Sequence, residues 1–336
     1  MIQEFGIIAD IGGTNARFAL APLKRLAADE KLELNEQELC YAKALNGAEY
    51  EGILEAIRAY LEHLPEQIKP IKQGVMAIAC PTDSDYIKMT NHTWKFSVSE
   101  LKQQLGFDSL KFINDYNALA NSVPHLDASG AIKIGRGTAI ENMPMVVTGP
   151  GTGLGLGTLV FDKHGVPITV ETEGGHAHFA PTDEVEIEIL RYLLTKYERV
   201  SAERLLSGMG LENIYQALHL YRKGEVAVLK AAEISAAAIN KTDAICEEAL
   251  ARMCSVLGHF AGDAALTCGA KGGVYIAGGI LPRFVDFFKN SAFRQSFEAK
   301  GRLSSFVVDI PTYLIVSTQP GLLGSAAVLN HIYNGH

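Results

Sequence analysis

The chain is poor in positive charge and has no long hydrophobic run. Its 336 residues include 30 lysines and arginines against 38 aspartates and glutamates, which gives a formal net charge of −8. No run of basic residues is longer than two. Nucleic acid is therefore not expected as a partner, because its phosphates require clustered Lys and Arg. No stretch of about 18 apolar residues is free of charges or of clustered Gly and Pro, so a membrane-spanning helix is not expected.

Cysteine is also scarce. The five cysteines are odd in number, widely separated and set among apolar neighbours: Cys40, Cys80, Cys246, Cys254 and Cys268. This pattern predicts reduced, mostly buried thiols in a cytoplasmic protein. The first residues, Met1 to Glu4, carry no positive charge and lead into no long apolar segment, so a signal peptide is not expected.

The chain does have two glycine-rich turns that resemble each other. They are Asp10-Ile11-Gly12-Gly13-Thr14-Asn15 and Gly149-Pro150-Gly151-Thr152-Gly153-Leu154-Gly155. An apolar, extended segment precedes and follows each turn, so each is expected to join two strands. Glycine lets backbone N–H groups approach an anion closely, and the threonine hydroxyl adds a donor. The pair predicts two clamps on a polyphosphate, although one such turn alone is more often a simple tight hairpin.

The setting of the first turn excludes other phosphate-binding motifs. A dinucleotide-binding turn would open directly into a helix, whereas the residues after Thr14 alternate as in a strand. No Gly-Lys-Ser or Gly-Lys-Thr follows, which excludes a P-loop, and the protein-kinase signatures are missing. Asp10 ends the first strand, where a lone carboxylate suits a hydrated Mg²⁺. Alternatively, Asp10 only stabilises its own turn.

Strands and helices alternate in both halves of the chain, which predicts an α/β fold. The expected strands are a hairpin over 5–20 and segments at 74–79, 110–113, 145–147, 158–161, 273–277 and 307–316. The expected helices cover 49–63, 97–105, 116–123, 183–197, 242–268, 283–289 and 321–331. A capping box at Asp183 and Glu186 is expected to open the helix at 183. The repeated hairpin indicates two similarly built halves with a cleft between them.

Asn114 and Asp115 stand where a short strand meets a helix. An aspartate held there can accept a hydroxyl proton as a general base. The neighbouring asparagine can both donate hydrogen bonds to a polyol and accept them from it. The alternative is that Asp115 merely caps a helix that begins at Tyr116.

Further carboxylates and a histidine lie in the second half. Glu173 and His176 flank two glycines in a tight turn, and a carboxylate can accept hydrogen bonds from two neighbouring sugar hydroxyls. Glu203 is a candidate for the same role, or a solvated helix residue. An alternative for Glu173, His176 and His178 is zinc binding.

A third glycine pair, Gly278 and Gly279, follows the strand expected at 273–277. A strand–Gly–Gly–helix unit would let a flat nucleobase or a ribose lie against bare backbone. The alternative is ordinary packing of a strand, a turn and a helix.

Together these motifs resemble the bacterial-type glucokinase family, within the superfamily of hexokinase, actin and the Hsp70 ATPase domain. The matching stretches follow the family's order nearly from end to end: Asp10–Arg17, Met89–Trp94, Ile113–Asp115, Gly151–Gly155, Glu173–His176, Ser201–Arg204, Gly272–Gly279 and Pro320–Gly324. The resemblance implies a two-domain, actin-like (ribonuclease H-like) α/β ATPase fold with a cleft between the domains. It implies a small domain of residues 1–125 and 317–336 and a large domain of residues 126–316, with hinges near 124–128 and 316–320.

The resemblance also implies a glucokinase activity, in which ATP with Mg²⁺ phosphorylates D-glucose at the 6-hydroxyl. Asp115 would be the base, and Asn114, Glu173, His176 and Glu203 would hold the other hydroxyls. The implied ATP-binding residues are Ala9, Asp10, Ile11, Gly12, Gly13, Thr14, Gly151, Thr152, Gly153, Gly278 and Gly279. A homodimer is implied as well. His178 is a departure, because members of the family carry aspartate there.

Two alternatives stay open beside this activity. One is a kinase for another hexose, which a single sequence does not exclude. The other is a non-catalytic sugar sensor on the same fold. Sugar-responsive repressors of the superfamily carry an N-terminal helix-turn-helix, whereas here the first strand is expected from about Phe5.

Overall fold

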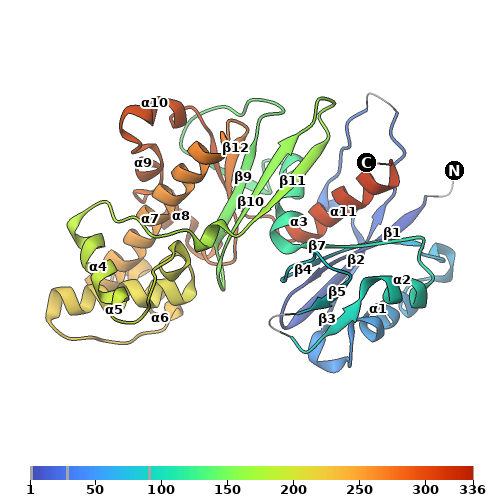
Figure 1. The fold of residues 1–336 in the computed structure, drawn as a ribbon, viewed down its shortest axis with the longest axis horizontal. Coiled ribbons are helices and arrows are strands. Elements are labelled where there is room, and N and C mark those ends of the chain that lie inside the picture. The colour runs from blue at the N-terminus through green and yellow to red at the C-terminus, as the bar shows by residue number, and fades with distance from the viewer. Residues whose placement is uncertain (1–2, 28–29, 90–91, 336) are drawn as a thin grey trace. The chain divides into compact units, whose positions relative to one another are not determined.

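The computed structural model describes residues 3–27, 30–89 and 92–335 (Figure 1). Thr90 and Asn91 of the motif at 89–94 lie outside the described residues. The chain forms two compact units, Met1–Gly130 with Ser317–His336, and Ala131–Val316. Residues 126–130, expected in the large domain, belong to the first unit, because Leu126 packs against its apolar core.

The first unit is built on a five-stranded sheet in the order β3-β2-β1-β4-β7. The strands are β1 (Phe5–Ile11), β2 (Asn15–Pro22), β3 (Cys40–Asn46), β4 (Gln73–Ile78) and β7 (Ser109–Asn114). β1, β2 and β3 are antiparallel, and β1, β4 and β7 are parallel. The hairpin expected over 5–20 is therefore confirmed. A separate two-stranded sheet joins β5 (Tyr86–Lys88) to β6 (Lys95–Ser97).

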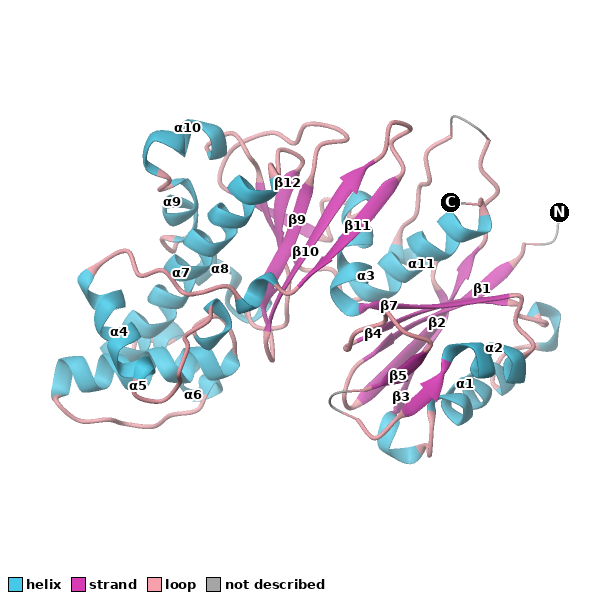
Figure 2. Cartoon of the chain, viewed as in Figure 1, coloured by secondary structure: helices cyan, strands magenta, loops and turns pink. Residues whose placement is uncertain are grey.

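Helices cover both faces of this sheet (Figure 2). Ile7 of β1 packs with α1 (Ile53–Glu62) and α2 (Val98–Leu105), whereas its neighbour Ile8 packs with α3 (Asp115–Ser122) and α11 (Pro320–Tyr333). A strand buried on both faces reads as a continuous apolar run, which explains the sequence at 7–9. Ser97 caps α2 by accepting a hydrogen bond from the Glu100 N–H at 3.2 Å.

The second unit repeats this plan in a six-stranded sheet, ordered β11-β10-β9-β12-β13-β8. The strands are β8 (Ala131–Ile134), β9 (Met145–Pro150), β10 (Leu154–Phe161), β11 (Pro167–Thr172), β12 (Gly273–Ile276) and β13 (Thr312–Ile315). β9, β10 and β11 are antiparallel, and β9, β12 and β13 are parallel. The same hairpin followed by parallel strands thus occurs in both units, which confirms the predicted repeat.

The helices of the second unit gather around one long central helix, α7 (Ala244–Cys268). The others are α4 (Glu184–Leu194), α5 (Gly208–Lys223), α6 (Ala231–Ile239), α8 (Val285–Lys289), α9 (Phe293–Glu298) and α10 (Ser304–Val307). α7 ends as expected at Gly269, which adopts a φ of 62°. No helix of the described residues combines the length and the apolar character that a membrane span needs.

Three local expectations are wrong. The strand expected over 307–316 is only β13, because residues 304–307 form α10 and bury Val307 in the core. The capping box at α4 is only half formed. Asp183 accepts from the Glu186 N–H at 2.9 Å, but the Glu186 carboxylate accepts from the Thr182 N–H at 2.7 Å instead of the Asp183 N–H. α4 also ends at Leu194, before the expected 197.

Candidate active site

The first unit brings its candidate residues to one edge of the sheet. In the parallel ladders, Ile11 of β1 pairs with Ile78 of β4, which pairs with Asn114 of β7. The carboxyl ends of these three strands therefore lie at one level, and Asp10 and Asp115 belong to that edge. The carboxyl edge of parallel strands is the usual ligand-binding edge of an open α/β sheet.

Asn114 and Asp115 form the junction between β7 and α3. Asn114 is the N-cap residue, and its Oδ1 accepts from the Tyr116 N–H at 2.9 Å. Asp115 is the first residue of the helix, so the alternative in which it caps a helix beginning at Tyr116 is wrong. Its Oδ1 also accepts from the Tyr116 N–H at 2.9 Å.

The first glycine turn closes the β1–β2 hairpin. The Gly12 N–H donates to the Asn15 carbonyl at 3.0 Å. Across the hairpin, Asp10 pairs with Arg17, whose Nη1 lies 3.6 Å from Asp10 Oδ2. Burial raises the pKa of Asp10, and the Arg17 charge opposes that shift. The ion pair supports the alternative in which Asp10 stabilises its own turn, while its side chain keeps 30% exposure.

The second glycine turn packs tightly on the segment that follows β12. A Cβ on Gly149 would lie 1.9 Å from the Ala277 carbonyl oxygen, and one on Gly278 would lie 2.3 Å from the Pro150 oxygen. Gly278 also has a φ of 95°, which side chains other than glycine rarely adopt. The structure therefore packs Gly149 and Pro150, which lead into the loop at 151–153, against Ala277 and Gly278.

Glu203 is held against this second turn. Its Oε2 accepts a hydrogen bond from the Leu154 N–H at 3.0 Å, and its side chain is 23% exposed. It lies in a 3-10 turn over Ala202–Arg204, so the alternative of a solvated helix residue is wrong. The Gly208 N–H, in the first turn of α5, donates to the Gly151 carbonyl at 3.1 Å.

Glu173 and His176 are brought to the same place by close backbone packing. A Cβ on Gly175 would lie 1.8 Å from the Leu154 carbonyl oxygen. His176 Nδ1 lies 3.9 Å from Glu203 Oε1, and His176 Nε2 lies 4.0 Å from Glu173 Oε2. The side chains of Glu173 and His176 are 83% and 50% exposed. The second unit thus presents two carboxylates and an imidazole in one accessible cluster beside the glycine loop.

Arg199 supports this cluster, although the sequence motifs do not indicate it. Arg199 Nη1 donates to the His176 carbonyl at 2.8 Å and so holds the turn from behind. The contact is made to backbone, and 23 residues separate the partners, so neither motif nor spacing indicates it.

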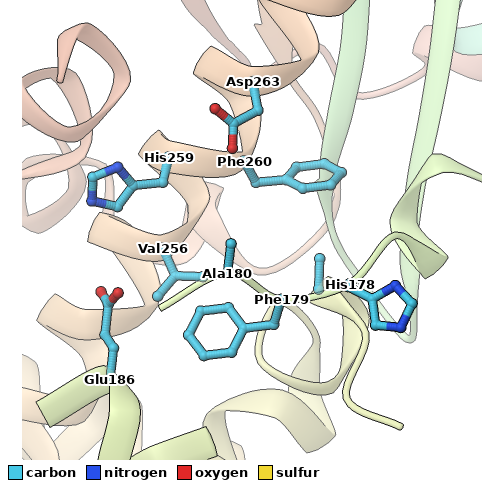
Figure 3. Close-up of a pocket in the computed structure, with 9 residues that line it drawn as sticks. His178, Phe179, Ala180, Glu186, Val256, His259, Phe260 and Asp263 are labelled. Atoms are coloured by element: carbon cyan, nitrogen blue, oxygen red, sulfur yellow. The ribbon is translucent and has the colours of Figure 1, made fainter. Parts of the chain in front are cut away.

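A small pocket lies behind the segments that carry His176 and Glu203. It is lined by residues that include His178, Ala202, Glu186 and His259 (Figure 3). Glu186 is 1% exposed, and its Oε1 lies 3.8 Å from Arg252 Nη1. Within the described part of the chain, no group of three or more His, Cys, Asp or Glu side chains could hold a metal ion. The zinc alternative for Glu173, His176 and His178 therefore has no structural support.

Two sheets of one topology, each with a glycine turn and acidic groups at its edge, define a phosphotransferase of the actin-like ATPase class. The family model of Glucokinase matches residues 7–332. The glucokinases of Colwellia psychrerythraea and Cronobacter sakazakii are 45% and 44% identical, and each alignment covers 98% of both chains. The crystal structure of a glucokinase from an Antarctic psychrotroph has a TM-score of 0.88 and 36% identity, over 98% of this chain and 99% of that one.

The chain therefore belongs to the glucokinase family, and it is a sugar kinase of the ATP:hexose phosphotransferase type. The family and the fold class expected from the motifs are confirmed.

Proposed function

We propose that the protein transfers the γ-phosphoryl group of ATP to the 6-hydroxyl of D-glucose, giving glucose 6-phosphate and ADP. This is the first step of glycolysis. The observation that carries the proposal is the cluster of Glu173, His176 and Glu203 beside the glycine loop at 151–153. Groups that suit sugar hydroxyls and a backbone that suits phosphate thus lie together in one unit of the chain.

The sugar would be held by carboxylate, imidazole and amide side chains. Ionised carboxylates form strong, charge-assisted hydrogen bonds, and the exposed Glu173 is open to a polyol. His176 lies between Glu173 and Glu203, at 4.0 and 3.9 Å, so the imidazole and both carboxylates lie in one cluster. Asn114 of the first unit would contribute a further amide group.

Asp115 would orient the 6-hydroxyl and accept its proton as the oxygen attacks the γ-phosphorus. The leaving group is ADP, and the proton passes to the carboxylate. Phosphoryl transfer depends mostly on positioning and on charge neutralisation, and a general base typically adds about 10²–10⁴ in rate. Burial raises the pKa of the Cys80 thiol, and the Asp115 charge adds to that effect, so this carboxylate lies near Cys80.

The phosphates would be bound by backbone N–H groups of the two glycine turns, at residues 9–14 and 151–153. The Gly278–Gly279 segment would lie against the nucleoside. Mg²⁺ is proposed as the cofactor, and it would neutralise charge on the phosphates. Asp10 fits this ion, because a single, partly exposed carboxylate suits a cation that keeps several of its waters.

A coupled assay of ADP release across a panel of hexoses tests the proposal. We expect the highest kcat/KM for D-glucose, with product phosphorylated at the 6-position. A higher kcat/KM for another hexose would replace glucose as the substrate, and ADP release that is independent of any sugar would contradict the kinase mechanism.

We also propose a cytoplasmic homodimer. All five cysteines lie within the described residues and are free, which fits a reducing compartment. Size-exclusion chromatography with light scattering tests the dimer, and cell fractionation tests the location. A mass of 36.3 kDa in solution, that of one chain, would contradict the dimer.

A further inference from the structure

The two carboxylate oxygens of Glu203 lie close to different parts of the candidate site. Oε2 accepts a hydrogen bond from the Leu154 N–H at 3.0 Å, at the point where the glycine loop becomes β10. Oε1 lies 3.9 Å from His176 Nδ1, in the cluster proposed to bind sugar. One oxygen therefore lies at the glycine loop proposed to bind phosphate, and the other lies at the cluster proposed to bind sugar.

The loop lies directly against this carboxylate. A Cβ on Gly153 would lie 2.5 Å from Glu203 Oε2, so a larger residue there would displace the loop or the carboxylate. The Glu203 backbone is fixed in turn, because the Ser207 hydroxyl donates to its carbonyl at 2.9 Å. At the other end of the loop, the Gly208 N–H donates to the Gly151 carbonyl at 3.1 Å. The segment 203–208 thus anchors both ends of the phosphate loop.

We infer that Glu203 is a positioning residue for the nucleotide as well as a ligand of the sugar. The inference deepens the proposed function and rests on it. By holding Leu154, Glu203 fixes the course of the backbone whose N–H groups would bind phosphate. A sugar hydroxyl that donates to Oε1 restrains the side chain, and the same restraint acts on Oε2 and on the loop. Sugar and nucleotide then each bind more tightly when the other is present.

Nucleotide affinity in the absence of sugar is the measurement that separates this role from simple sugar binding. Isothermal calorimetry with ADP and Mg²⁺ would compare the wild type with Glu203→Ala, Glu203→Gln and Glu173→Ala. Glu203→Ala removes the acceptor for the Leu154 N–H, and we expect ADP affinity to fall about tenfold, the scale of one hydrogen bond to a charged group. Glu203→Gln keeps an amide oxygen that can accept from Leu154, and we expect it to retain most of the ADP affinity.

Glu173→Ala is the matched control. It also removes a carboxylate proposed to bind sugar, but Glu173 is 83% exposed and faces His176 at 4.0 Å. We expect it to leave ADP affinity within about twofold of the wild type, the range for an exposed group outside the loop. Both alanine variants should raise the KM for glucose.

These measurements distinguish the positioning role of Glu203 from the proposed kinase function. Wild-type ADP affinity in Glu203→Ala, with a raised glucose KM, would overturn the positioning role and leave the proposed function standing. An equal loss of ADP affinity in Glu203→Ala and Glu173→Ala would also overturn it, since the loss would then be general. A wild-type glucose KM in both would count against the proposed function itself.

One further variant covers the case in which Glu203→Ala does not fold. Gly153→Ala keeps the carboxylate and places a methyl group 2.5 Å from its oxygen, so the loop or the side chain must shift. We expect it to weaken ADP binding while thermal unfolding still shows a single cooperative transition. Unchanged ADP affinity in this variant would refute the inference.

Discussion

The turn that carries His176 packs so closely on Leu154 that Gly175 has no room for a side chain. A Cβ on Gly175 would lie 1.8 Å from the Leu154 carbonyl oxygen, where real Cβ atoms essentially never come within 3.0 Å. Gly175→Ala would therefore force the 174–176 turn and the start of β10 apart by more than an ångström. Leu154 also holds Glu203 through its N–H at 3.0 Å, so both proposed sugar-binding side chains should move.

The expected effect of Gly175→Ala is large on catalysis and modest on stability. A misplacement of about 1 Å at a reacting site can cost about 10²-fold in rate, and overpacking typically costs about 1–3 kcal/mol of unfolding free energy. Steady-state kinetics with glucose, together with urea unfolding, would measure both quantities. Gly208→Ala is the matched control, because a methyl there meets its nearest neighbour, the Gly151 oxygen, at 4.0 Å. Equal kcat/KM in the two variants would refute the reasoning.

Three further predictions follow from other parts of the structure. Glu186→Ala should lower the unfolding free energy by about 2–4 kcal/mol in urea titration, because the buried carboxylate accepts from the Thr182 N–H and hydroxyl at 2.7 and 2.8 Å; a loss below about 0.5 kcal/mol would contradict this. Burial lowers the pKa of His125 to about 4 from 6.5, so its unfolded form binds the proton more tightly. The wild type should therefore lose about 2 kcal/mol of stability between pH 7 and pH 5 that His125→Gln does not lose, and parallel losses in both proteins would contradict the assignment. We propose that sugar binding makes the protein more compact and so excludes water from the transfer, and glucose should then lower the radius of gyration measured by small-angle scattering; an unchanged radius at saturating sugar would contradict this.

The elements that could be predicted are those with strong local signals. The hairpin of β1 and β2 follows from strand-like alternation after Thr14, and α7 follows from a long periodic pattern that ends at Gly269. The edge strand β11 is mostly exposed and so leaves little hydrophobic pattern. Helix α5 begins with two glycines in its first turn, which weakens its helical signal, and it was not predicted.

The strand predicted over 307–316 is only partly formed, because an apolar run does not by itself distinguish a strand from a helix. Phe306 and Val307 suit a strand locally, but residues 304–307 form a helical turn that packs Val307 into the core. Periodicity cannot distinguish a short buried helix from a short buried strand. Pro311 then separates that turn from β13, whose first residue is Thr312.

The motifs indicated the candidate residues of the site, but not how they are joined. Glu203 and Leu154 are 49 residues apart, and their hydrogen bond uses a backbone N–H that carries no sequence signature. The pocket behind His178 combines side chains from α4, α7 and the segment 178–180, and no spacing connects them. Both features depend on tertiary packing between distant segments, which local sequence patterns do not encode.

We propose that Asp115 is the base of the phosphoryl transfer. The most direct test measures kcat for glucose phosphorylation by Asp115→Asn, together with glucose affinity by calorimetry. We expect kcat to fall by about 10²–10⁴ while glucose affinity stays within about tenfold of the wild type. A kcat near that of the wild type would contradict it.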